Sequence, residues 1–204
     1  MSIRFDHRTK ETFKKDIYTG TRMEKYFFNK WLEVCDSRDD ILIDDPRNNG
    51  VDNTGEFIEN GKNTAGADYK VDIKYQDLDL QNHPLEVKWC PTAGKLTLKT
   101  NDLKAYIREG ASILFIYNSV SCGTNLRMPR GGNNLEKHFD LIESKQKQFR
   151  WGIMWHDSVK EFLEYSQEND LVKSIPYMGH KLGIVLPSKE YSRWFKEEDW
   201  CNGS

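Results

Sequence analysis

The sequence is poor in the features that mark membrane, secreted and zinc-binding proteins. Its longest apolar stretches, such as Ile113–Tyr117, run to about five residues, whereas a membrane-spanning helix needs roughly 20. The first residues, Met1–Arg8, contain no apolar core, so we expect no secretory signal. The four cysteines lie far apart, with no CxxC pair. Neither a zinc site nor a disulfide framework is indicated, and we expect a reduced cytoplasmic protein.

The chain also lacks a strong excess of either charge. It has 30 basic and 32 acidic residues among 204, with a formal net charge of −2. A general nucleic-acid coat protein would be basic, so that class is disfavoured. An enzyme that acts on nucleic acid remains compatible, because a local basic groove can coexist with acidic patches. Aromatic residues make up 12% of the chain, too many for a disordered protein, and the length suits a single domain over residues 1–204.

Hydrophobic spacing predicts the first two elements and a long connection after them. Apolar residues recur at three- and four-residue spacing over Thr21–Val34, which predicts an amphipathic helix. Asp40–Asp44 is typical of a short strand. Residues 45–66 contain a proline, four glycines and many asparagines, and predict a turn-rich connection of a length that is more often functional than decorative.

The strongest periodic signal predicts a hairpin. Apolar and charged residues alternate strictly over Asp68–Tyr75, and the alternation returns over Leu85–Trp89. We expect the two strands to pair in antiparallel fashion around a turn near Gln81–Pro84. Their apolar faces must coincide, so the acids and one lysine are expected to share the opposite, solvent-accessible face. These charged residues are Asp68, Asp72, Glu86 and Lys88.

The remainder of the chain predicts a mixed sheet. A helix over residues 101–109 ends at Gly110, and the continuous apolar run Ala111–Tyr117 is typical of a central strand covered on both faces. A strand, a helix and a second strand form a crossover, so the sheet should contain a parallel pair. Farther along we expect a helix over 135–149, a strand over 151–155, and helices over 158–168 and 189–200.

The charged face of the hairpin suggests a metal site. Carboxylates held close together repel one another, and a divalent cation removes that cost. Hard oxygen ligands suit Mg²⁺, for which Mn²⁺ often substitutes. Such an ion can polarise a phosphodiester and generate a hydroxide. A lysine two residues beyond Glu86 can hold the phosphate as a point charge. The alternative is that Glu86 and Lys88 form an ordinary exposed ion pair.

These residues resemble a known family. Gly66-Ala67-Asp68, an alternating strand, a turn and Leu85-Glu86-Val87-Lys88 are similar to the signature of the PD-(D/E)xK nuclease superfamily. The resemblance covers about residues 20–118. It implies an α/β fold with a mixed central sheet flanked by helices, in the order helix, three-strand meander, helix, strand. Residues 119–204 would then be a C-terminal extension with helical additions, packed on that restriction-endonuclease-like core.

The resemblance also implies roles for individual residues. Asp68, Glu86 and Lys88 would act in catalysis, with Asp68 and Glu86 as metal ligands. Glu24 occupies the place of a helix glutamate that reaches the metal in many members. Alanine stands at position 67 where the family has proline, so the assignment of the aspartate is open. Motif context favours Asp68, and Asp72 is the alternative ligand.

The function expected on this basis is hydrolysis of DNA phosphodiester bonds by a Mg²⁺-activated water, as in restriction, junction-resolving or repair endonucleases. An RNA-directed nuclease and a non-catalytic nucleic-acid-binding module of the same fold are the alternatives. Small members often act as homodimers, and a chain of this kind could belong to a phage or mobile element. Basic residues that could contact the phosphate backbone are Lys99, Lys104, Arg127 and Arg130.

Overall fold

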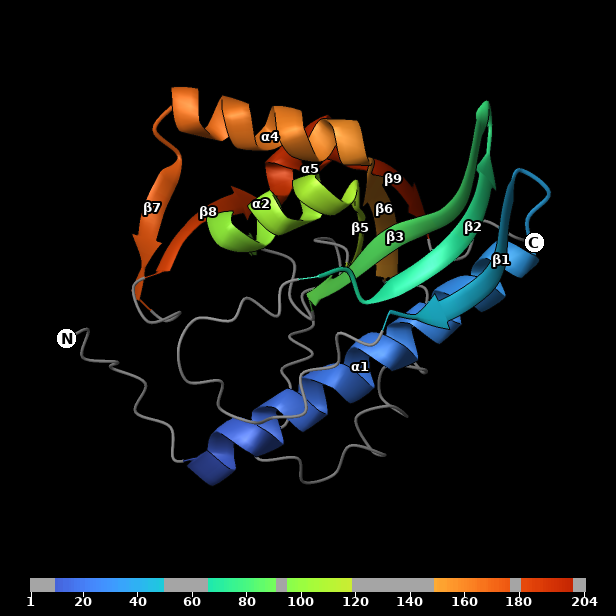
Figure 1. Cartoon of the computed structure of the whole chain (residues 1–204), viewed down its shortest axis with the longest axis horizontal. Helices are drawn as coiled ribbons and strands as arrows, with labels where there is room; N and C mark the ends of the chain where they lie inside the picture. The colour runs from blue at the N-terminus through green and yellow to red at the C-terminus, as the bar shows by residue number, and fades with distance from the viewer. Residues whose placement is uncertain (1–9, 50–65, 91–94, 119–148, 177–180, 200–204) are drawn as a thin grey trace.

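A computed structural model of the chain describes residues 10–49, 66–90, 95–118, 149–176 and 181–199. The described residues form a mixed α/β structure in which helices flank a mixed central sheet (Figure 1). The elements in chain order are α1 (Lys10–Asp36), β1 (Ile41–Asn48), β2 (Tyr69–Tyr75), β3 (Leu78–Cys90), β4 (Lys95–Lys99), α2 (Thr100–Glu109), β5 (Ser112–Asn118), β6 (Phe149–Met154), α4 (His156–Glu168), β7 (Val172–Ile175), β8 (Lys181–Pro187), the 3-10 turn η5 (Ser188–Glu190), α5 (Tyr191–Trp194) and β9 (Lys196–Asp199).

The central sheet has six strands in the order β1-β2-β3-β5-β6-β9. Strands β1, β2 and β3 form an antiparallel meander, and β5 runs parallel to β3 after the α2 crossover. The expected mixed sheet is therefore confirmed. A second sheet, of three strands, has the order β4-β8-β7.

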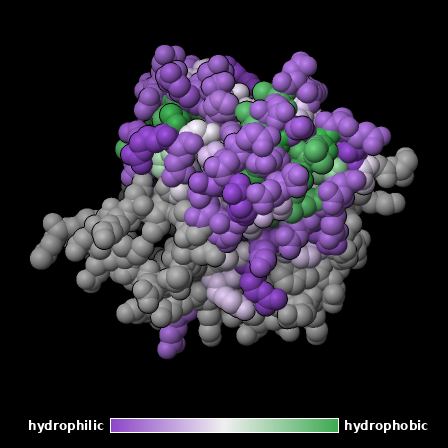
Figure 2. Space-filling model, turned by 45° about the vertical axis from the view of Figure 1, so that its right-hand side comes forward, coloured by the Kyte–Doolittle hydropathy of each residue, from purple (hydrophilic) through white to green (hydrophobic). Residues whose placement is uncertain are grey.

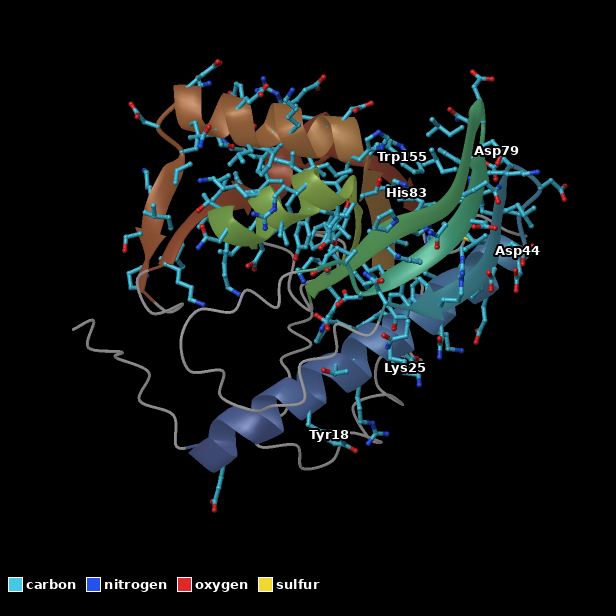
Figure 3. The ribbon with its side chains drawn as sticks, in the orientation of Figure 1. Tyr18, Lys25, Asp44, Asp79, His83 and Trp155 are labelled. Atoms are coloured by element: carbon cyan, nitrogen blue, oxygen red, sulfur yellow. The ribbon has the colours of Figure 1, made fainter. Side chains whose placement is uncertain are left out.

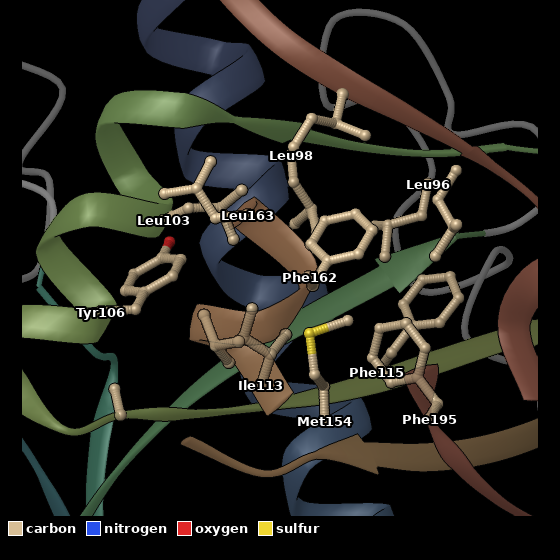
Figure 4. Packing of buried hydrophobic residues seen from close by; sticks show 14 of the residues in the cluster. Leu96, Leu98, Leu103, Tyr106, Ile113, Phe115, Met154, Phe162, Leu163 and Phe195 are labelled. Atoms are coloured by element: carbon tan, nitrogen blue, oxygen red, sulfur yellow. The ribbon is translucent and has the colours of Figure 1, made fainter. Parts of the chain in front are cut away.

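Each face of the central sheet has its own hydrophobic core. On one face, α1 buries Met23, Phe27 and Trp31 against the apolar side chains of β2 and β3. Their spacing is the helical one that the sequence predicts. On the other face, α2 and α4 pack over a second cluster, part of which is drawn in Figure 4. Its labelled members are Leu96, Leu98, Leu103, Tyr106, Ile113, Phe115, Met154, Phe162, Leu163 and Phe195.

Strand β5 lies between the two cores. Residues Ala111–Tyr117 are all buried, which confirms the expectation of a central strand covered on both faces. The helix before it ends as predicted. Gly110 adopts the left-handed conformation (φ 67°), and its N–H bonds back to the carbonyl oxygens of the last helical turn. This is the conformation that glycine adopts most readily.

The predicted turn at Gln81–Pro84 is wrong. The chain reverses at Gln76 (φ 54°), and β3 begins at Leu78. The polar segment is instead a β-bulge, because Val71 pairs with His83 while Ile73 pairs with Leu80. One extra residue in β3 is accommodated there, and a bulge uses the same polar residue types as a turn.

The predicted helix over residues 189–200 is also wrong. Residues 191–194 form one helical turn, Phe195 is buried in extended conformation, and β9 then pairs with β6. Tyr191 and Phe195, four residues apart across that turn, are both buried in the second core. The strand expected over 151–155 and the helix expected over 158–168 are present as β6 and α4. The helix expected over 135–149 lies outside the described residues.

The described surface is largely hydrophilic, as a charged fraction of 30% requires. Figure 2 shows green hydrophobic groups set among purple hydrophilic side chains. No helix in the described ranges combines the length and apolar character needed to cross a bilayer. Among the residues that the structure describes, the large apolar side chains that remain exposed are Tyr18, Leu42, Leu78, Leu171 and Leu182.

Candidate functional site

The site lies where β2 and β3 separate. The last backbone pair of their ladder at this end joins Tyr69 with Leu85. Beyond it, the carboxylate of Asp68 takes over from the backbone: its Oδ2 accepts the N–H of Val87 at 2.9 Å. This bond fixes Asp68 beside the segment of β3 that carries Glu86.

Glu86 is held from two sides. One of its oxygens, Oε1, accepts a hydrogen bond from the ammonium of Lys88, which lies on the same face of the strand. The same oxygen accepts the hydroxyl of Tyr106, on α2, at 2.6 Å. The second oxygen, Oε2, is buried and has no hydrogen-bond partner among the described residues. A buried carboxylate oxygen without a partner is costly, so this atom is suited to meet a ligand.

The expectation that these charges share a solvent-accessible face is wrong for Glu86. Its side chain is only 4% exposed, and that of Lys88 is 28% exposed. The reason is a tertiary contact that the strand pattern does not contain. Helix α2 packs over this face of β3, bringing Tyr106 onto Glu86. Strand alternation correctly predicts which residues share a face, but a separate element decides whether that face is covered.

The electrostatics of the site follow from this burial. Burial, followed by the nearby Glu86 carboxylate, raises the pKa of Asp68 to about 8. Lys88 and the Val87 N–H act in the opposite direction. Burial alone would lower the pKa of Lys88, but the negative charge of Glu86 in particular outweighs it and raises that pKa well above its ordinary value. Lys88 therefore stays cationic.

Glu24 approaches the same group from α1. Its side chain is half-buried, and its charge acts on both Asp68 and Lys88, raising the pKa of each. The structure thus brings together four of the residues that the sequence singles out, from α1, from β3 and from the position just before β2. They are Glu24, Asp68, Glu86 and Lys88.

Asp72 lies elsewhere. Its Oδ1 accepts the N–H of Asn82 at 2.6 Å, inside the bulge of β3, and it does not contribute to the pKa shift of Asp68. Of the two aspartates, only Asp68 is placed beside Glu86.

The predicted basic contacts are scattered in the structure. Lys99 forms an ion pair with Asp102 at 3.2 Å, and Lys104 is exposed on α2. Arg127 and Arg130 lie outside the described residues.

Sequence reasoning missed Tyr106 and misplaced His83. The only local signal for Tyr106 is its helical spacing from Leu103, which marks a core position and not a hydroxyl donor to Glu86. Position 83 was expected in a turn and is a buried strand residue, with its Nε2 at 2.8 Å from the hydroxyl of Ser112.

The oxygen atoms of the site are of the kind that binds a hard cation, but the described side chains are not grouped closely enough to coordinate one. Carboxylate oxygens are the ligands that Mg²⁺ prefers, and Glu86 Oε2 is such an oxygen, buried and unpartnered within the described part of the chain. Across the described ranges, however, no three His, Cys, Asp or Glu side chains form a group that could hold a metal ion. Comparison of the chain with protein-family models, with curated proteins and with solved structures gives no match.

Proposed function

We propose that this chain is a metal-dependent nuclease that hydrolyses phosphodiester bonds, with DNA as the favoured substrate. The observation that carries the proposal is the convergence of Asp68, Glu86 and Lys88 where β2 and β3 part, with one buried Glu86 oxygen left unpartnered among the described residues. An ordinary exposed ion pair would be solvated on both sides. In this pair the glutamate is buried, and its Oε2 accepts no hydrogen bond from the described residues.

The order of the elements supports a restriction-endonuclease-like core. Helix α1 precedes the meander β1-β2-β3, and α2 and β5 follow it, with β5 parallel to β3. This is the order that the resemblance to the PD-(D/E)xK superfamily implies. The short strand β4 is an insertion between β3 and α2 that pairs with β8. Strands β6 and β9 widen the sheet on the side away from the site.

In this proposal each residue has a distinct task. Asp68 and Glu86 supply oxygens to a divalent cation, which would polarise the phosphate and lower the pKa of its bound water. Glu86 can offer Oε2, because Oε1 is occupied by Lys88 and Tyr106. Lys88, held cationic by its acidic neighbours, binds the phosphate and stabilises the negative charge that develops on it. Glu24 adds a third carboxylate from α1.

The test is a cleavage panel with matched variants. Supercoiled, linear, single-stranded and four-way-junction DNA, together with RNA, are incubated with the chain in Mg²⁺, Mn²⁺ or EDTA. We expect cleavage that EDTA abolishes, and that Glu86→Gln removes while Asp79→Asn retains it. Asp79 is the matched control because it is an exposed acid at the far end of the same hairpin. Cleavage in EDTA, or by Glu86→Gln at the wild-type rate, contradicts the proposal.

A second candidate function is a nucleic-acid-binding module without catalysis. The observation that favours it is the contact of Lys88 with Glu86 itself, together with the lack of a three-residue metal group in the described ranges. Calorimetric titration with Mn²⁺ separates the two. Binding that is lost in Glu86→Gln supports the nuclease. Retention of DNA on the chain with no Mn²⁺ binding and no cleavage supports the binding module.

A further inference from the structure

A pair of histidines lies between β3 and the start of α4. His83, on β3, is 7% exposed, and His156 begins α4. Their ring centres are 5.6 Å apart, with the ring planes inclined at 59°. Figure 3 shows His83 on β3 near Trp155, the residue that precedes α4. The site described above does not use either imidazole.

Each ring has one nitrogen near an oxygen atom and a second nitrogen without a hydrogen-bond partner among the described residues. His156 Nε2 lies 3.3 Å from a carboxylate oxygen of Asp157, and its Nδ1 is buried with no hydrogen-bond partner in the described ranges. His83 Nε2 lies 2.8 Å from the hydroxyl of Ser112. This is the only hydrogen bond that His83 makes within the described part of the chain, so its Nδ1 is also left over.

This arrangement is typical of histidines that bind a metal. A ligating histidine usually donates its other N–H to a carboxylate or another oxygen, which fixes the tautomer and leaves a lone pair for the ion. The Asp157 carboxylate near Nε2 favours the tautomer of a neutral His156 that has the proton on Nε2 and the lone pair on Nδ1. The Ser112 hydroxyl can accept from His83 Nε2 in the same way.

The spacing of the rings fits one shared ion. A zinc ion about 2.1 Å from a nitrogen of each ring stands roughly 3.2 Å from each ring centre, and a tetrahedral angle then separates the centres by roughly 5.2 Å. The observed 5.6 Å is close to that value. Burial, followed by the neighbouring His156, lowers the pKa of His83 to about 4, so His83 is neutral near pH 7 and in the form that binds metals.

We propose that His83 and His156 form a binding site for a borderline transition-metal ion such as Zn²⁺ or Cu²⁺, separate from the carboxylate site. Imidazole nitrogens suit these ions, whereas oxygen ligands suit Mg²⁺. Because no third His, Cys, Asp or Glu of the described residues completes the group, water fills the remaining positions. The ion would join β3 to the start of α4.

The experiment is calorimetric titration of the full chain with Zn²⁺ in excess Mg²⁺, which keeps the carboxylate site from contributing. We expect one Zn²⁺ per chain, and at least a tenfold loss of affinity in His156→Gln. The matched controls are His138→Gln and His180→Gln, which also remove one of the five histidines and should bind as wild type. His156 is partly exposed, so its substitution should not prevent folding.

Two further readouts do not depend on enzyme activity. Zn²⁺ should raise the melting temperature of the wild type but not of His156→Gln, because an ion that binds only the native state stabilises it. Cu²⁺ should bind more tightly than Zn²⁺, and its electron paramagnetic resonance spectrum should report two nitrogen ligands in wild type and one in His156→Gln. Equal Zn²⁺ affinity in wild type and His156→Gln, or no binding in wild type, overturns the proposal. Neither result affects the proposed nuclease.

Discussion

The two ends of the β2–β3 hairpin have nearly the same sequence pattern and very different surroundings. At the turn end, Lys74 and Asp79 form an ion pair at 3.6 Å with both side chains more than half exposed. At the open end, Glu86 and Lys88 form an ion pair in which the glutamate is 4% exposed. The first pair is solvated. The second is covered by α2 and surrounded by two more acids, Asp68 and Glu24.

This difference shows which of the two ion pairs should affect the free energy of unfolding. An exposed pair contributes about 0 to 1 kcal/mol to stability, because water solvates the separated ions almost as well. A buried pair depends on both partners, because removing one leaves the other charge in the interior. The open end of the hairpin is therefore the end where substitutions should have large effects, both on stability and on any chemistry.

The largest expected effect separates the two aspartates. Asp68→Asn should reduce cleavage about 100- to 1,000-fold, the loss typical of removing one group that stabilises a transition state. Asp72→Asn should retain most of the activity, because Asp72 bonds to the bulge and not to the site. Both changes are isosteric and remove one negative charge. Parallel rates on one DNA substrate in Mg²⁺ test this, and the reverse order would move the catalytic aspartate to Asp72.

The next effect compares the two lysines. Lys88→Ala should lower the free energy of unfolding by about 3 kcal/mol, because Glu86 would remain buried without its cation. Lys74→Ala should change it by less than about 1 kcal/mol. Urea unfolding at pH 7 measures both. Adding Glu86→Gln to Lys88→Ala should restore part of the loss, since the buried charge is then gone. Equal effects of the two lysine substitutions would show that burial does not distinguish the pairs.

A smaller effect concerns the hydroxyl that reaches the open end from α2. Tyr106→Phe removes the hydrogen bond to Glu86 Oε1, and hydrogen bonds to charged groups contribute about 1.5–3 kcal/mol. The control is Tyr165→Phe, which removes a hydroxyl that accepts from Arg193 in an exposed position and should cost less than about 1 kcal/mol. Thermal unfolding of the two variants checks the difference, and a Tyr106→Phe chain as stable as wild type would remove Tyr106 from the site.

The pH dependence of stability should also differ between the two ends. The pKa of Asp68 is raised to about 8 in the folded chain, so between pH 5 and 8 the native state holds a proton that the unfolded state has lost. Stability from this group is present at low pH and falls as the pH rises toward about 8. In EDTA, we expect Asp68→Asn to flatten the decline by more than about 1.4 kcal/mol, the equivalent of one pKa unit. Asp72→Asn should leave the slope unchanged.

Much of this arrangement could be predicted from the sequence because it depends on local pattern. The spacing of Met23, Phe27 and Trp31 predicts the buried face of α1, and the unbroken apolar run after Gly110 predicts β5. Antiparallel pairing of the two strands is also predicted, but the register that sets Asp68 beside Glu86 depends on the turn at Gln76 and on the bulge in β3, which the sequence pattern places wrongly.

The rest depends on contacts between distant segments. The cover of α2 over Glu86 joins residues 20 positions apart, and no periodicity within either element reports it. The bulge at Gln81 and Asn82 resembles a turn because both positions are polar and a proline follows closely. The prediction of a helix over residues 189–200 failed for a related reason. Helical spacing of Tyr191, Trp194 and Phe195 is compatible with a long helix, but pairing of β9 with β6 ends it after one turn.

The smallest expected effect concerns the bulge itself, between the two ends. Asp72 Oδ1 accepts the N–H of Asn82, which sits at φ 51°, so Asp72→Ala removes the acceptor that stabilises this conformation. Asn82 is exposed, and water can replace the lost partner, so the cost should be about 1 kcal/mol, near the lower range for a hydrogen bond. Asp72→Asn keeps an oxygen in place and should cost less. Urea unfolding of both variants, with cleavage assayed in parallel, tests whether Asp72 acts on the strand alone. A loss of activity in Asp72→Ala larger than its loss of stability explains would join the bulge to the site and make the two ends of the hairpin one functional unit.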